Sequence, residues 1–323
     1  MSHTEAREAS ESSPKPRVDP RLASALLLCA VVATLAAVDA AVRFGIGRIS
    51  RIEGRTEKEW TEALAIGSRQ GASKQVLLIG NSLLLEGVDY PALQRELSPE
   101  FIVRRYVVES TQYLDWRYGL AHLYSRGARP DVVVLSIGGN QLPVNQIRDG
   151  YFAYRLMDTS DFLEASRAAG LSGTETFSLL VANLSVFYGT RSETRKVLLA
   201  RMAPFVKNLQ PFFVPAPEHT QPDRSRLIDV CAQRLKALDE LARAHGSRFI
   251  FLEPATVKAD EESYIREAAK RAEVPALVPL PAAALSATDF SDGYHLNPSG
   301  ASRYTTALAP ALRGTMKALI EGN

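Results

Sequence analysis

Ser82 is the first of three candidate chemical groups in the sequence. It follows a run of apolar residues and Gly80, which permits a sharp turn at the end of a strand. A serine hydroxyl is a weak nucleophile alone and needs a neighbouring base to attack a carbonyl carbon. Taken alone, a serine in this position is more commonly a turn residue or a helix cap, so any chemistry at Ser82 depends on partners elsewhere in the chain.

A loop near the carboxyl end supplies the second group, because it contains Asp292 and His295 three residues apart. An imidazole can take the proton of a serine hydroxyl while a carboxylate fixes the tautomer of the ring and stabilises the imidazolium. The same spacing also occurs in ordinary capped loops. The chain has only 5 histidines, so the pairing favours Ser82 as nucleophile, His295 as base and Asp292 as the residue that orients the base.

The third group is Asn140, which follows an apolar run and two glycines, Gly138 and Gly139. The glycines let the backbone approach a bound group closely, and the Asn140 amide can then donate to a developing oxyanion. Considered alone, the Gly-Gly-Asn sequence is typical of a turn.

The elements around these groups predict an α/β fold. Short Val-, Leu- and Ile-rich runs alternate with amphipathic stretches, which is the pattern of a parallel sheet covered by helices on both faces. Ligands of such sheets bind beyond the carboxyl ends of the strands, where Ser82 and Asn140 are expected. Strands are predicted at 75–79, 101–108, 131–137, 248–252 and 276–278, and helices at 90–97, 113–126, 177–188, 227–244 and 261–272 and from Asn297-Pro298 onward.

Together these segments resemble the SGNH, or GDSL-like, hydrolase superfamily, in order and in spacing along residues 75–315. The resemblance implies a three-layer, flavodoxin-like fold and acyl-ester chemistry without a metal or another cofactor. It implies that Ser82 attacks an acyl carbonyl, with the Ser82 backbone amide and the Asn140 side chain holding the oxyanion beside Gly139. The matching segments are Gly80-Asn81-Ser82, Gly138-Gly139-Asn140-Gln141 and Asp292-Gly293-Tyr294-His295.

The sequence departs from the family pattern at three places. Asn81 and Gln141 each replace an aspartate of that pattern. The family's second block supplies a glycine whose amide completes the oxyanion hole, and the segment after the second predicted strand has none. Ser110 or Thr111 is then the expected source of that amide. A non-catalytic glycan-binding or scaffold protein that retains the SGNH fold is the alternative function.

The N-terminal region predicts attachment to a membrane. Residues 1–20 are polar and predict a disordered cytoplasmic tail. The apolar segment that follows has about the 20 residues needed to cross a bilayer, and we expect a transmembrane anchor at 21–45. A signal peptide cleaved after Ala40 is the alternative. The remaining chain is expected to form a linker or helix at 46–74 and a hydrolase-like domain at 75–323, with a mostly helical insertion at 142–221.

Composition excludes several other classes. The chain has 38 basic and 36 acidic residues without a long basic run, so no nucleic-acid partner is expected. Two cysteines, Cys29 and Cys231, provide neither a disulfide framework nor a zinc pattern.

These features predict a single-pass inner-membrane protein whose periplasmic domain is a serine esterase or O-acyltransferase. It would act on acyl esters, chiefly acetyl esters, of cell-envelope glycans through an acyl-Ser82 intermediate. The expected partners are an acylated glycan or lipid substrate, the inner membrane, and a multi-span protein that exports acyl groups. The same residues serve transfer to a sugar hydroxyl and hydrolysis by water, so the sequence leaves both open.

Overall fold

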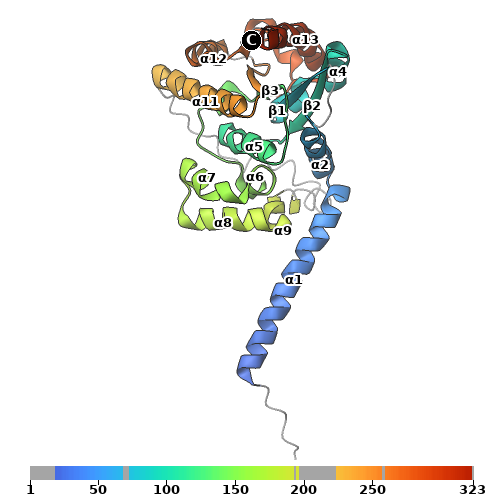
Figure 1. The fold of residues 1–323 in the computed structure, drawn as a ribbon, viewed down its shortest axis with the longest axis vertical. Coiled ribbons are helices and arrows are strands. Elements are labelled where there is room, and N and C mark those ends of the chain that lie inside the picture. Colours follow the sequence, from blue (N-terminus) through green and yellow to red (C-terminus); the bar gives the residue numbers. More distant parts are fainter. Residues whose placement is uncertain (1–18, 68–72, 193, 196–222, 257–258, 322–323) are drawn as a thin grey trace, which may run out of the picture.

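A five-stranded parallel sheet forms the centre of the protein, in the order β2-β1-β3-β4-β5 (Figure 1). The computed structural model describes residues 19–67, 73–192, 194–195, 223–256 and 259–321, so residues 1–18 of the predicted tail lie outside it. The sheet confirms the predicted α/β class. Its strands are β1 (Lys74–Gly80), β2 (Phe101–Val107), β3 (Val132–Ser136), β4 (Arg248–Leu252) and β5 (Ala276–Leu277).

Helices cover both faces of the sheet because the apolar strands have no polar face. Successive side chains of a strand point to opposite faces, and in β1 Leu77 and Ile79 enter one core while Val76 and Leu78 enter the other. The first core is closed by α2 (Arg51–Leu64), α5 (Tyr113–Ser125), α11 (Arg224–Ala244) and α12 (Ala259–Ala272). The second is closed by α3 (Ser82–Gly87), α4 (Tyr90–Leu97) and α13 (Pro298–Glu321).

The strand order reverses at β1, which pairs with β2 on one side and with β3 on the other. Ligand sites of open α/β sheets form at such a reversal, outside the carboxyl ends of the strands. Gly80 ends β1 there, beside Ser136 of β3. A Cβ atom on Gly80 would lie 2.1 Å from the Ser136 carbonyl oxygen, so only glycine fits this close approach.

The described part of the insertion is mostly helical, as predicted. It contains α6 (Asp149–Arg155), α7 (Phe162–Ala168), α8 (Gly173–Leu184) and α9 (Val186–Gly189). Most of 194–222 lies outside the described residues.

The single helix predicted at 177–188 is wrong. Ser172 caps α8 five residues before position 177, in a reciprocal capping box with Glu175. Ser185 then has extended backbone angles, ends α8 and caps α9 through its own side chain.

The N-terminal helix α1 (Pro20–Ile49) projects away from the domain (Figure 1). Its segment Pro20–Gly45 has 26 residues, and the most apolar 18-residue window of that segment has a mean hydropathy of 2.4 and no buried residue. Ser50 separates α1 from α2 and caps the latter. Within the described chain, α1 is the one helix long and apolar enough to cross a membrane.

Candidate active site

Ser82 lies at the carboxyl end of β1, as the first residue of the short helix α3. The preceding residue, Asn81, is the cap of that helix, and its side-chain oxygen accepts a hydrogen bond from the Leu83 N–H at 3.0 Å. The cap fixes the turn between strand and helix, so the half-buried Ser82 is presented at the edge of the sheet.

His295 joins Ser82 to Asp292 in one chain of hydrogen-bonding groups. His295 Nε2 lies 3.0 Å from Ser82 Oγ, and Nδ1 lies 2.7 Å from Asp292 Oδ2. The second carboxylate oxygen, Asp292 Oδ1, accepts from the backbone N–H groups of Tyr294 and His295 at 2.9 and 2.7 Å. The structure therefore places Ser82 beside His295, which lies 213 residues later in the chain.

Those hydrogen bonds determine the charge on Asp292. The backbone N–H of His295, followed by the His295 ring and the Tyr294 N–H, holds the pKa of the Asp292 carboxyl well below its ordinary value. An ionised carboxylate beside Nδ1 favours the tautomer with the proton on Nδ1. The lone pair of Nε2 then faces the Ser82 hydroxyl, which is the arrangement a general base requires.

The two departures from the family pattern, Asn81 and Gln141, bind each other. Asn81 Nδ2 donates to Gln141 Oε1 at 2.7 Å and to the Thr111 carbonyl oxygen at 2.9 Å. Gln141 Oε1 also accepts from the Gly138 N–H at 2.8 Å, and Gln141 Nε2 donates to the Tyr294 hydroxyl at 3.2 Å. This amide pair thus links the ends of β1, β2 and β3 to the loop that carries the histidine.

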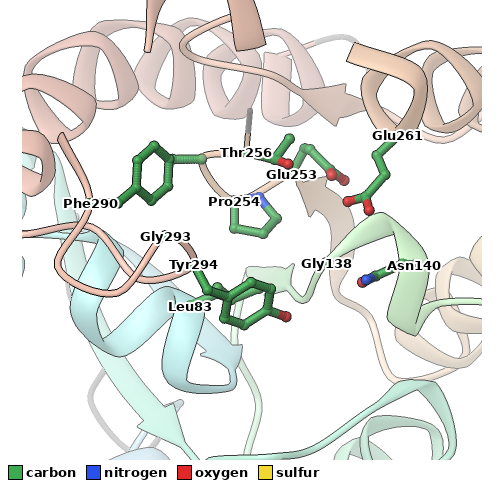
Figure 2. A pocket seen from close by; sticks show the side chains of 11 residues that line it. Leu83, Gly138, Asn140, Glu253, Pro254, Thr256, Glu261, Phe290, Gly293 and Tyr294 are labelled. Carbon is green, nitrogen blue, oxygen red and sulfur yellow. The ribbon is translucent and has the colours of Figure 1, made fainter. Parts of the chain in front are cut away.

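Asn140 lies in a 3₁₀ turn, Gly139–Gln141, directly after β3, and its side chain is exposed. It lines a small pocket beside the site with Leu83, Gly138 and Tyr294 (Figure 2). Gly139 is buried, and its N–H donates to Glu253 Oε1 at 3.3 Å. The Gly139 N–H is therefore already hydrogen-bonded to Glu253, whereas the Asn140 side chain lines the pocket.

Ser110 and Thr111 follow β2 and differ in environment. The Thr111 side chain is buried, where its hydroxyl donates to the Val108 carbonyl oxygen and accepts from Trp116 Nε1. Ser110 is exposed and has a φ of 59°, in the left-handed region that favours glycine. The hydroxyl of Thr111 is thus committed to packing, and the backbone at Ser110 has the shape of a glycine turn.

Comparison with solved structures gives a distant likeness. No protein-family model matches the chain, and no curated protein matches it. A crystal structure of TesA is 14% identical to it, with 75% of this chain and 99% of that chain covered and a TM-score of 0.40. At that identity and TM-score the likeness identifies neither an activity nor a substrate.

Glu253 is a site residue that the sequence analysis missed. It follows β4 directly, is 1% exposed and lines the pocket together with Asn140 and Glu261 (Figure 2). Burial, reinforced by the charge of Glu261, raises the pKa of the Glu253 carboxyl well above its ordinary value. Burial therefore favours the protonated form of Glu253 over the carboxylate. Its position after an apolar strand, which it shares with Ser82 and Asn140, is the signal that could have identified it.

Proposed function

We propose that the protein is a membrane-anchored serine esterase or O-acyltransferase of the SGNH type. The observation that carries this proposal is the continuous line from Asp292 through His295 to Ser82, with contacts of 2.7 and 3.0 Å at the carboxyl edge of the sheet. Nucleophile, base and orienting carboxylate in hydrogen-bond contact are the signature of acyl transfer through a covalent intermediate.

In the first half-reaction, Ser82 Oγ attacks the acyl carbonyl carbon while His295 Nε2 takes the hydroxyl proton. The tetrahedral intermediate collapses when His295 returns that proton to the leaving alcohol, which leaves an ester on Ser82. In the second half-reaction, His295 deprotonates water or a sugar hydroxyl, which attacks the acyl carbon. The bond from that carbon to Ser82 Oγ then breaks, and His295 returns the proton to Oγ. Asp292 remains ionised throughout and stabilises the imidazolium.

Three donors are proposed for the oxyanion. Ser82 is the first residue of α3, and the first N–H groups of a helix have no acceptor within it. The exposed Asn140 side chain supplies the second donor, from the mouth of the pocket. The third is the backbone amide at Ser110, which we favour over Thr111 because Ser110 has the φ of a glycine. Each such donor is worth about 3 kcal/mol of transition-state stabilisation in enzymes of this kind.

The proposed substrate is an acyl ester, chiefly an acetyl ester, of a cell-envelope glycan. An exposed site on a domain that carries an apolar helix is consistent with a polymer substrate beside a membrane. We further propose a single-pass inner-membrane location with the domain in the periplasm, and a multi-span partner that supplies activated acyl groups. Transfer and hydrolysis share the acyl-Ser82 intermediate and differ only in the acceptor.

The test uses the full chain in detergent micelles with para-nitrophenyl acetate and a fluorophosphonate probe. In Ser82→Ala and His295→Ala we expect no burst of para-nitrophenol release, and a turnover rate lower by about three orders of magnitude or more. Ser82→Ala should also lose labelling by the probe. Ser302→Ala, at an exposed position on α13, is the matched control. A folded wild-type protein without acyl release or labelling would refute the enzyme and favour the glycan-binding alternative. If activity is present, oligosaccharide acceptors then separate transfer from hydrolysis.

A further inference from the structure

The outward face of α8 is apolar, although it does not contact the rest of the domain. Phe177 and Leu184, seven residues and two helical turns apart, are 66% and 64% exposed. The inward face of the same helix buries Leu179 and Ala182. Phe187 on α9 is a further exposed aromatic residue, at 41%. Large apolar side chains left exposed on a helix whose inward face is also apolar indicate contact with a second apolar phase.

This apolar face is attached to α1. Asp39 of α1 accepts hydrogen bonds from Ser185 Oγ at 2.7 Å and from the Phe187 N–H at 3.0 Å. Figure 1 shows α8 and α9 at the end of the domain from which α1 projects. The junction between α8 and α9 therefore lies at the level of Asp39 along α1.

The length of α1 places Asp39 at the edge of a bilayer. The segment Pro20–Gly45 has 26 residues, which is about 39 Å of helix at about 1.5 Å per residue. The hydrocarbon layer takes up about 30 Å, or about 20 residues. Counted from Pro20, about 20 residues end at Asp39, the first charged residue after Arg21. Arg43, one turn further on and 3.7 Å from Asp39, then has its half-exposed side chain at the level of the lipid headgroups.

A second set of contacts fixes the insertion against the N-terminal helices. Arg155 at the end of α6 bridges Glu53 and Glu57 of α2, with both nitrogen–oxygen distances at 2.5 Å. The Arg155 side chain is 9% exposed, and that of Glu53 is fully buried. The insertion is thus held at two levels, to α2 through Arg155 and to α1 through Asp39.

We infer that Phe177, Leu184 and Phe187 form a membrane-seating surface that enters the interfacial layer of the lipid bilayer beside α1. This inference rests on the proposed function, in which α1 spans the membrane. Lipid is the occupant because the seating surface continues the unburied apolar side of α1 at the depth where acyl chains meet headgroups. Aromatic and aliphatic side chains at that boundary are typical of interfacial anchors. A seated domain would hold Ser82 at a constant height above the membrane.

The test uses the full chain reconstituted in phosphatidylcholine–phosphatidylglycerol vesicles. Cys29→Ala and Cys231→Ala remove the native thiols, and a single cysteine is then introduced and labelled with an environment-sensitive fluorophore. The positions are Phe187→Cys on the seating surface, Val32→Cys on α1, and Ser302→Cys on α13 as the aqueous control. Lipids with brominated or spin-labelled acyl chains quench only fluorophores that contact the bilayer.

The inference predicts quenching at positions 187 and 32 that is at least about twofold stronger than at 302. Leu184→Cys repeats the measurement on α8, and retained Ser82 labelling by fluorophosphonate shows that each variant is folded. If the fluorophore at position 32 is quenched, and those at 187 and 184 are quenched no more than the one at 302, the seating surface is overturned. That result leaves the membrane span of α1 in place. That result would also mean that protein and not lipid covers this face. An absence of quenching at position 32 would overturn the span and the seating surface together.

Discussion

Replacing Glu253 by glutamine is expected to change how the stability of the protein depends on pH. The carboxyl is buried at 1% exposure, and burial raises its pKa well above the value of 4.5 that it has in the unfolded chain. Between those two pKa values the folded state keeps a proton that the unfolded state releases. The free energy of unfolding therefore falls as pH rises through this window, by up to about 1.4 kcal/mol per pH unit from this one group.

Glu253→Gln keeps the shape and the acceptor for the Gly139 N–H and removes the titrating proton. We expect the variant and the wild type to be about equally stable near pH 4.5, and the variant to gain relative stability as pH rises above that value. The measurement is urea unfolding of the full chain in micelles at a series of pH values, followed by the fluorescence of Trp60 and Trp116. Glu240→Gln, exposed on α11, is the matched control. Parallel pH profiles for Glu253→Gln and wild type would refute a raised pKa for the Glu253 carboxyl.

Three further variants test the positioning of the site. Gln141→Ala removes the oxygen that accepts hydrogen bonds from Asn81 Nδ2 and the Gly138 N–H. We expect about a tenfold to hundredfold lower kcat in esterase kinetics, and a loss of at most about 2 kcal/mol in unfolding free energy by urea unfolding. Asp292→Asn should lower kcat by about 10³- to 10⁴-fold without unfolding the protein, because the amide no longer stabilises the imidazolium of His295, and unchanged turnover would contradict that role. Gly80→Ala places a Cβ 2.1 Å from the Ser136 carbonyl oxygen, so we expect a loss of about 3 kcal/mol or more in stability, seen in thermal unfolding.

The sheet and the Asp292–His295 pair were predictable because each has a local signal. Continuous apolar runs predicted the central strands β1 and β3 within one or two residues, since buried parallel strands have no polar face. The Asp292–His295 pair was recognisable because its geometry is set within one short loop. Its contact with Ser82 followed only from the resemblance to a family pattern, which orders segments that are distant in sequence.

Features that depend on distant contacts were not predictable. The interruption at Ser185 reflects a hydrogen bond to Asp39, 146 residues earlier in the chain, and not a local breaker such as proline. The partnership of Asn81 with Gln141 joins residues 60 apart, and each looked like an isolated departure in the sequence. Glu253 had a local signal in its polar position after an apolar strand, but its pocket partners Asn140 and Glu261 are distant in sequence or separated from it by a loop.

Direct detection of an acyl group on Ser82 tests the central claim. The full chain is mixed with para-nitrophenyl acetate, quenched in acid within the first turnovers, digested and analysed by mass spectrometry, with Ser82→Ala and Ser302→Ala in parallel. The account predicts that the peptide containing Ser82 gains the mass of one acetyl group in wild type and in Ser302→Ala, and that Ser82→Ala carries no acetyl in that peptide. Turnover without acetyl on Ser82, or acetyl retained in that peptide of Ser82→Ala, would contradict it.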